Sequence, residues 1–144
     1  MPINNIYNEI LTYHNMHPSN KYDLENHNIE LEGVNPSCGD DIFLRLYINN
    51  DGIIENAAFN GDGCAISQAS ADIMIDMVKG KTKEQAIHLS RIFMKMIKEG
   101  VSEDELEELE EASALKDISH MPARVKCAVL SWRTLAEALG EDIE

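Results

Sequence analysis

Basic residues are scarce in this sequence, which has 12 lysines and arginines against 26 acidic residues and a formal net charge of −14. A nucleic-acid-binding surface needs a concentration of Lys and Arg to contact phosphates, so this charge argues against nucleic acid as a partner. The acidic surface is compatible with docking to a basic partner, and equally with a solubilising role alone.

Long apolar runs are also missing, which excludes a membrane span. The first residues, "MPINNIYNEI", lack the basic n-region and apolar h-region of a signal peptide. We therefore expect a cytoplasmic protein. With 144 residues, 44% of them hydrophobic, the chain is expected to form a single domain over residues 1–144.

Cysteines are few, and they are odd in number and widely spaced: Cys38, Cys64 and Cys127. A secreted disulfide scaffold would have a denser, even set. In a reducing compartment, isolated cysteines serve as core residues, metal ligands or nucleophiles, and their surroundings must distinguish these roles.

The clearest local pattern is a β-hairpin. Apolar and other residues alternate through "DIFLRLYI" (41–48), which predicts a half-buried strand. The sequence "NNDG" then predicts a tight turn, after which "IIENAAFN" (53–60) returns as the partner strand. The polar, mixed residues 21–37 are expected to be irregular.

Helical periodicity accounts for most of the remaining chain. The predicted helices cover residues 4–14, the segment from Cys64 to Lys79, the segment from Thr82 to Gly100, the acidic segment that follows Ser102, and the segment that begins at Pro122. This order predicts an α+β fold, in which helices pack on one face of a small antiparallel sheet of about three strands.

Each cysteine lies at the boundary of a predicted element, where a core cysteine is not expected. Cys38 precedes Gly39 in the loop that leads into the first hairpin strand. Cys64 and Cys127 lie near the beginnings of helices, where free N–H groups and a partial positive charge favour a thiolate.

Asp40 adds a carboxylate two residues after Cys38, and the intervening Gly39 permits an unusual backbone conformation. Three thiolates and one carboxylate would suit a tetrahedral, borderline-soft cation such as zinc. The residues alone leave three alternatives open, namely a metal site, a reactive thiol and structural cysteines.

The histidines give weaker signals. His120 lies seven residues before Cys127 and therefore does not directly precede this cysteine. The others are interpreted as surface or hydrogen-bonded residues rather than metal ligands, and these are His14, His17, His27 and His88.

The motifs "CGD", "GDGCAIS" and "PARVKC" together resemble those of the SufU proteins, within the wider IscU/NifU N-terminal-like group of iron–sulfur assembly proteins. The resemblance covers most of the chain, from the "YHNMHPSN" loop to the last helix. It implies an iron–sulfur cluster assembly protein with the SufU/IscU-like fold.

The resemblance also implies a site and an activity. Zn²⁺ would be bound by Cys38, Asp40, Cys64 and Cys127. The protein would act as a zinc-dependent sulfurtransferase that accepts persulfide sulfur on Cys38 from a pyridoxal-phosphate-dependent (SufS-type) cysteine desulfurase and serves downstream Suf scaffold proteins. Arg124 is a candidate for stabilising the persulfide anion or holding Asp40, with a surface salt bridge as the alternative.

Two features resemble SufU rather than scaffold-type IscU proteins. Lys126 stands where the scaffold type has a histidine before the last cysteine, and Gly100–Leu115 forms an apparent insertion. Two other functions stay open: a scaffold that assembles and hands on a transient iron–sulfur cluster, and a protein whose zinc is purely structural.

Overall fold

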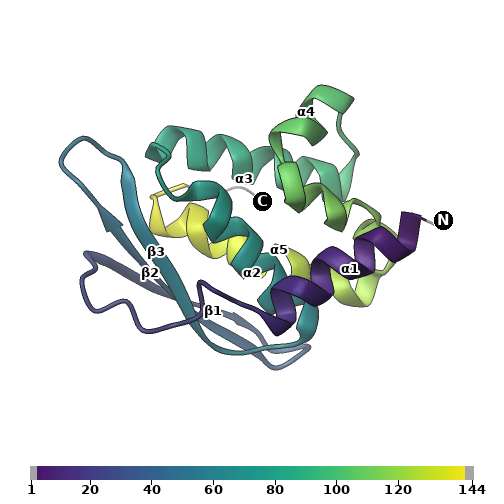
Figure 1. Cartoon of the computed structure of the whole chain (residues 1–144), viewed down its shortest axis with the longest axis horizontal. Coiled ribbons are helices and arrows are strands. Elements are labelled where there is room, and N and C mark those ends of the chain that lie inside the picture. The colour runs from purple at the N-terminus through teal and green to yellow at the C-terminus, as the bar shows by residue number, and fades with distance from the viewer. Residues whose placement is uncertain (1–2, 142–144) are drawn as a thin grey trace.

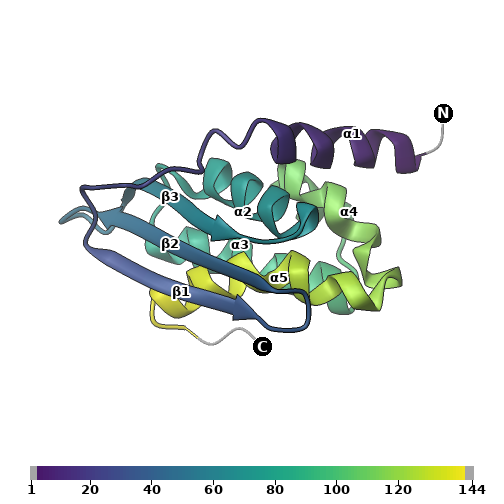
Figure 2. The same ribbon diagram turned by 90° about the horizontal axis from the view of Figure 1, so that it is seen from below.

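A three-stranded antiparallel sheet and the helices on one of its faces make up residues 3–141, the part of the chain that the computed structural model describes, with side chains from Glu9 onward (Figures 1 and 2). The strand order is β1–β2–β3, with bounds Ile29–Asn35, Asp40–Ile48 and Ile54–Asp62. The helices are α1 (Ile3–Met16), α2 (Ala65–Val78), α3 (Lys83–Lys98), α4 (Glu103–Glu108), the 3₁₀ helix η1 (Glu110–His120) and α5 (Pro122–Ala138). The predicted α+β class is confirmed.

The hairpin of β2 and β3 follows the predicted alternation. Ile42, Leu44 and Leu46 are fully buried, whereas Phe43 between them is exposed. Gly52 in the connecting turn has a φ of 77°, a left-handed conformation that glycine adopts without steric cost. The apolar face of the hairpin is the one that faces the helices.

Strand β1 corrects the expectation that residues 21–37 are irregular. Ile29–Asn35 pair with β2 along their whole length, from Ile29 opposite Leu46 to Asn35 opposite Asp40. The pattern was hard to read because Gly33 occupies a buried position without a side chain. A Cβ on Gly33 would collide with Thr134 of α5, so the glycine allows α5 to pack closely on the strand.

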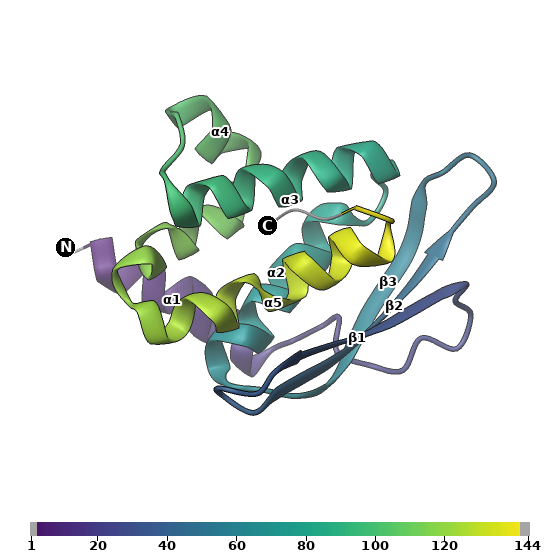
Figure 3. The ribbon, with the colours of Figure 1, turned by 180° about the vertical axis from the view of Figure 1, so that it is seen from behind.

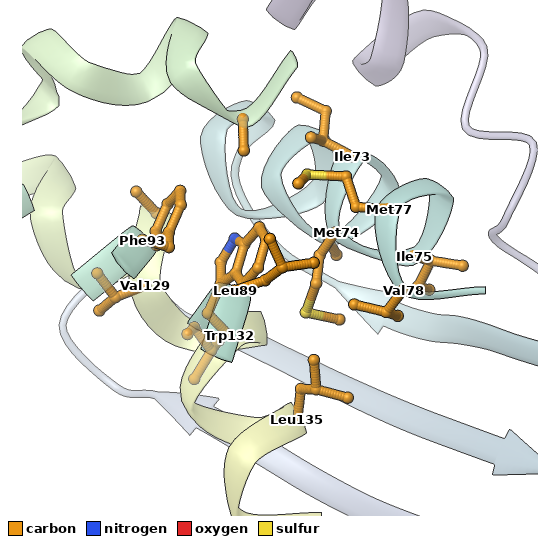
Figure 4. Packing of buried hydrophobic residues seen from close by; sticks show 14 of the residues in the cluster. Ile73, Met74, Ile75, Met77, Val78, Leu89, Phe93, Val129, Trp132 and Leu135 are labelled. Atoms are coloured by element: carbon orange, nitrogen blue, oxygen red, sulfur yellow. The ribbon is translucent and has the colours of Figure 1, made fainter. Parts of the chain in front are cut away.

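Helices α2, α3 and α5 lie together on one side of the sheet, with α5 over β1 and β2 and α2 against β3 (Figure 3). Phe93 of α3 stacks on Trp132 of α5 with ring centroids 4.4 Å apart (Figure 4). The Trp132 indole donates a hydrogen bond to Ser70 of α2, which satisfies its buried N–H group. This core fixes α2 and α5, the two helices that follow or contain cysteines.

The helix boundaries agree well with the sequence signals. Thr82 and Ser102 form the capping boxes of α3 and α4 with Gln85 and Glu105, and Pro122 begins α5. The acidic segment is divided, however: α4 ends at Glu108 and the 3₁₀ helix η1 begins at Glu110, whose φ of 47° interrupts the helical conformation. Among the described residues, no helix is both long enough and apolar enough to span a bilayer.

Candidate metal centre

The four predicted ligands come from three separate parts of the chain and meet at one end of the sheet. Cys38 lies on the turn between β1 and β2, and Asp40 is the first residue of β2. Cys64 is the N-cap residue of α2, and Cys127 lies in the second turn of α5. The β1–β2 turn approaches the beginning of α5, where the Cys38 Sγ is 3.8 Å from the carbonyl oxygen of Ala123 (Figure 2).

The donor atoms are close enough to share a cation. The Sγ atoms of Cys38 and Cys127 are 3.1 Å apart. These two sulfurs and a carboxylate oxygen of Asp40 all lie within 4.8 Å of one another. Cys64 stands beside this group, and its thiol interacts with that of Cys127. The structure thus brings three of the four predicted ligands into one group, while the thiol of Cys64 lies outside that group and interacts with Cys127.

Asp40 is fully buried and yet held in its ionised form. Burial by itself would raise its pKa, but hydrogen bonds to the carboxylate outweigh burial and lower the pKa overall. Its Oδ1 accepts the backbone N–H of Cys64 at 2.8 Å and the hydroxyl of Ser67 at 3.2 Å. Its Oδ2 accepts the Asn35 amide at 3.1 Å. A carboxylate oriented in this way is prepared to act as a ligand.

The thiol of Cys127 has the opposite tendency. Burial raises its pKa well above that of a free thiol, and the neighbouring Cys38, Cys64 and Asp40 raise it further. Without a cation, Cys127 is therefore protonated at neutral pH, which corrects the expectation of a thiolate near the beginning of a helix, because burial outweighs the effect of the helix N-terminus. Binding of a thiophilic cation must release this proton, because the thiolate is the metal-ligating form.

Two glycines shape the centre. Gly39, between Cys38 and Asp40, has a φ of 73°, which confirms the unusual backbone predicted at this position. Gly63, before Cys64, passes so close to Asp40 that an added Cβ would lie 3.1 Å from Oδ1. Both positions let the main chain bring ligands together that larger residues would hold apart.

Asn35 and Ser67 are the residues that sequence reasoning missed. The Asn35 amide contacts both Asp40 and, at 3.8 Å, the Sγ of Cys127, so it links two ligands. Asn35 belongs to the stretch expected to be irregular, which hid its role. Ser67 could have been noticed, because it follows Cys64 by three residues and so lies one helical turn away.

Arg124 is exposed on the first turn of α5. The groups that hold Asp40 come from Asn35, Cys64, Ser67 and Cys127, and within the described residues Arg124 is not among them. The alternative in which Arg124 holds Asp40 therefore has no contact to support it. Its guanidinium is available to a molecule that approaches the centre from outside.

Three thiols and one carboxylate fit a tetrahedral zinc site, since thiolates and carboxylates are both zinc ligands. The set of ligating groups found at this end of the described structure includes no imidazole. It differs in this respect from the fully closed structural sites built from cysteine and histidine alone.

The fold and this cysteine–aspartate centre agree with one class of protein. Residues 6–128 match the NifU-like N terminal domain family, and the chain belongs to this family. The resemblance stated from the motifs is confirmed.

Two relatives are each more than a third identical to this chain over most of its length. The chain is 39% identical to the zinc-dependent sulfurtransferase SufU of Bacillus subtilis, over 97% of this chain and 93% of that protein. It is 38% identical to the iron–sulfur cluster assembly scaffold protein IscU of Streptococcus pyogenes, over 95% of this chain and 84% of that protein.

Among solved structures, it is similar to a putative iron–sulfur cluster assembly scaffold protein for the SUF system from Fervidobacterium islandicum. The TM-score is 0.85 at 33% identity, with 91% of this chain and 94% of that chain covered. The relatives therefore include both a sulfurtransferase and scaffold proteins, which are the two functions expected from the sequence.

Proposed function

We propose that this protein is a zinc-dependent sulfurtransferase of iron–sulfur cluster assembly that accepts persulfide sulfur from a cysteine desulfurase. Its zinc ligands are Cys38, Asp40, Cys64 and Cys127. The donor is a pyridoxal-phosphate enzyme of the SufS type, the downstream recipients are Suf scaffold proteins, and the exchange takes place in the cytoplasm. The names of the relatives support this proposal.

The observation that carries the proposal is that the fold holds some of the ligands more firmly than others. Asp40 is fully buried and accepts three hydrogen bonds, and Cys127 is buried within a helix. Cys38 lies on a turn and is partly exposed. A turn residue can move away from the centre at little cost, whereas a helical residue packed in the core cannot. Cys38 is therefore the ligand suited to leave and react.

The chemistry that follows is a thiol–disulfide type of exchange. Zinc held by these residues would keep the cysteine sulfurs in the thiolate form. The Cys38 thiolate attacks the terminal sulfur of the donor's persulfide, so that a new S–S bond forms on Cys38. The S–S bond of the donor breaks, and its cysteine leaves as a thiolate. No oxidant or reductant is needed, because sulfur is transferred at constant overall oxidation state.

We assign to Arg124 the stabilisation of the persulfide anion that forms on Cys38. A persulfide is ionised at neutral pH, and the exposed guanidinium one turn before Cys127 can stabilise it by a charge-assisted hydrogen bond. Arg124 thus acts on the transferred sulfur rather than on Asp40.

Scaffold activity is the second candidate, since IscU proteins are among the relatives. The resemblance favours transfer over assembly in two respects. Lys126 occupies the place of the histidine found in scaffold-type proteins, and the apparent insertion Gly100–Leu115 forms α4 and the first part of η1.

The test is a desulfurase assay combined with metal analysis. Purified protein should contain about one zinc per chain and should stimulate sulfur release from the cysteine desulfurase. Cys38→Ala should abolish the stimulation while it leaves the fold intact. Ser37→Ala, an exposed neighbour on the same turn, serves as the matched control and should retain it.

The two candidates predict different results. Undiminished stimulation by Cys38→Ala would remove Cys38 from the mechanism. Anaerobic reconstitution that gave a stable, transferable cluster at full occupancy would favour the scaffold instead.

A further inference from the structure

A second group of ligating side chains lies where α1, α2 and η1 meet, apart from the cysteine centre. His14 of α1 is buried, with 2% of its surface exposed. Its Nδ1 is 2.7 Å from Oδ2 of Asp72 on α2, and its Nε2 is 3.2 Å from Oε1 of Glu111 on η1. Asp76, one turn after Asp72, places a carboxylate oxygen within 4.8 Å of both the His14 ring and the Glu111 carboxylate. We call these four residues the His14 cluster.

Asp72 determines which nitrogen of His14 faces the other acids. It is 1% exposed, and its Oδ1 accepts the backbone N–H of Asn20 at 2.9 Å. Its Oδ2 is an acceptor when Asp72 is ionised, and Nδ1 of His14 is then the donor in this contact. Nε2 is then the nitrogen directed at Glu111. A histidine whose far nitrogen donates to a buried carboxylate is the arrangement that orients imidazole ligands in metal sites.

The contact between Nε2 and Glu111 needs a positive charge between its two atoms. A neutral imidazole with its proton on Nδ1 presents a lone pair at Nε2, and the carboxylate oxygen presents another. A proton on Nε2 makes this approach favourable: burial by itself lowers the pKa of His14, but the contacts with Asp72 and Glu111 outweigh burial and raise the pKa overall. A metal cation that replaced this proton would be held by the same atoms. Asp76, whose Oδ1 accepts the side-chain amide of Asn20 at 2.8 Å, adds a further negative charge within 4.8 Å of a His14 ring nitrogen and of the Glu111 carboxylate. This charge strengthens the attraction for a cation of higher charge than a proton.

We propose that Nε2 of His14 and the carboxylates of Asp76 and Glu111 bind a first-row divalent cation such as Zn²⁺, with Asp72 as the positioning residue. One imidazole and two carboxylates suit this class, whereas Ca²⁺ and Mg²⁺ prefer oxygen ligands alone. The site lacks thiolates, so it binds the cation more weakly than the cysteine centre does.

The chain contains a natural comparison in His88 and Glu108. Their contact is of similar length, 3.1 Å, but both side chains are about half exposed, at 55% and 48%. In the described structure this pair is not part of a group with a third ligating residue. It is an ordinary surface pair, of the kind that contributes little to stability. Burial, a fixed tautomer and a third ligand distinguish the His14 cluster from it.

A cation in the His14 cluster would join η1 to α1 and α2. Because such a cation binds the folded chain and not the unfolded one, it raises the free energy of unfolding, by an amount that grows with the logarithm of its concentration above the dissociation constant. The bound cation would then stabilise the segment that follows Gly100, in addition to its buried residues Leu109 and Leu115.

The experiment uses the full chain with its cysteine centre already filled by one equivalent of Zn²⁺, followed by titration with Co²⁺. Zinc binds more tightly than cobalt at a given site, so the cysteine centre stays occupied. A second equivalent bound at the His14 cluster should give cobalt d–d absorption without thiolate-to-cobalt charge-transfer bands. Zn²⁺ in place of Co²⁺ should raise the melting temperature further.

Variants of the His14 cluster test where the second equivalent of cation binds. Glu111→Gln and Asp76→Asn change exposed carboxylates and leave the core intact, so these chains should fold. Each should weaken binding of the second Co²⁺ by about tenfold or more, and His14→Gln should abolish it. Glu108→Gln is the matched control and should bind Co²⁺ like the wild type.

Two results would overturn the proposal. One is a zinc-loaded wild type that takes up no second cation, which would mean that the His14 cluster holds only a proton. The other is a second cation bound equally well by Glu111→Gln, Asp76→Asn and the wild type. Neither result bears on sulfur transfer, because none of these residues belongs to the cysteine centre.

Discussion

The cysteine centre and the acidic segment at residues 100–120 both concentrate charge and polar groups, but they do so in opposite surroundings. At the centre, Asp40 is fully buried and surrounded by donors. In the acidic segment, most glutamates of α4 and η1 are exposed, and Glu105 interacts with Lys95 and the cap residue Ser102 at the surface.

This difference decides what each charge can do. In the desolvated centre, hydrogen bonds and charges act at low effective dielectric, so they set protonation states and orient ligands. At the surface, water and salt screen the same charges, and each pair contributes little. Changes at the centre should therefore have large effects, and changes in the acidic segment small ones.

Asp40→Ala should show the largest effect. The substitution removes a proposed zinc ligand and leaves the groups on Asn35, Cys64 and Ser67 without their acceptor. Since each buried unsatisfied group costs about 1–3 kcal/mol, we expect a loss of about 3 kcal/mol or more in the free energy of unfolding. Denaturant unfolding and a zinc-affinity measurement would check this.

Asp41→Asn is the control for that experiment. Asp41 is the next residue of β2, and it interacts with Glu32 on the neighbouring strand, where the contact raises the pKa of Glu32. Zinc affinity should be unchanged in this variant. A comparable loss of zinc in both variants would mean that Asp40 has no special role.

Gly63→Ala should have an intermediate effect. The new Cβ would press on Ser67 and lie 3.1 Å from Oδ1 of Asp40, so the carboxylate or α2 must shift. Overpacking of this kind costs about 1–3 kcal/mol, and the displaced ligand should weaken zinc binding. Ala65→Ser, an exposed change on the other side of Cys64, should preserve both stability and zinc binding.

Glu105→Gln should have the smallest effect, a slight loss of stability at neutral pH that disappears at low pH. Hydrogen bonds from Ser102 and Lys95 lower the pKa of Glu105 in the folded state below its ordinary 4.5. The folded protein thus binds this proton less readily than the unfolded chain does. The resulting stability is fully present above pH 4.5 and is lost as the pH falls through the folded-state pKa.

Thermal unfolding from neutral to acidic pH would test this expectation. The variant should lose less stability than the wild type below pH 4.5. Glu107→Gln, an exposed change on the same helix, should follow the wild-type curve. Parallel curves for Glu105→Gln and the wild type would show that the capping interaction contributes nothing measurable.

Local signals predicted much of the fold. The hairpin turn at Gly52, the capping boxes at Thr82 and Ser102 and the helix start at Pro122 each depend on residues within one turn of one another. Strand β1 could not be predicted in this way, because its seven residues gain their conformation from pairing with β2 and from the approach of α5 at Gly33. The break at Glu110 was likewise not visible, since no glycine or proline marks it.

The sequence by itself determined the chemistry of the donors: three thiols, a carboxylate beside Cys38, and a glycine between them that permits a left-handed backbone. It also determined the family, because these residues occur within motifs. Only the tertiary structure decided which donors are buried, that Asn35 links Asp40 to Cys127, and that His14 meets two acids from other helices. The physical reason is that burial and long-range hydrogen bonding arise from packing between distant segments, which no local pattern records.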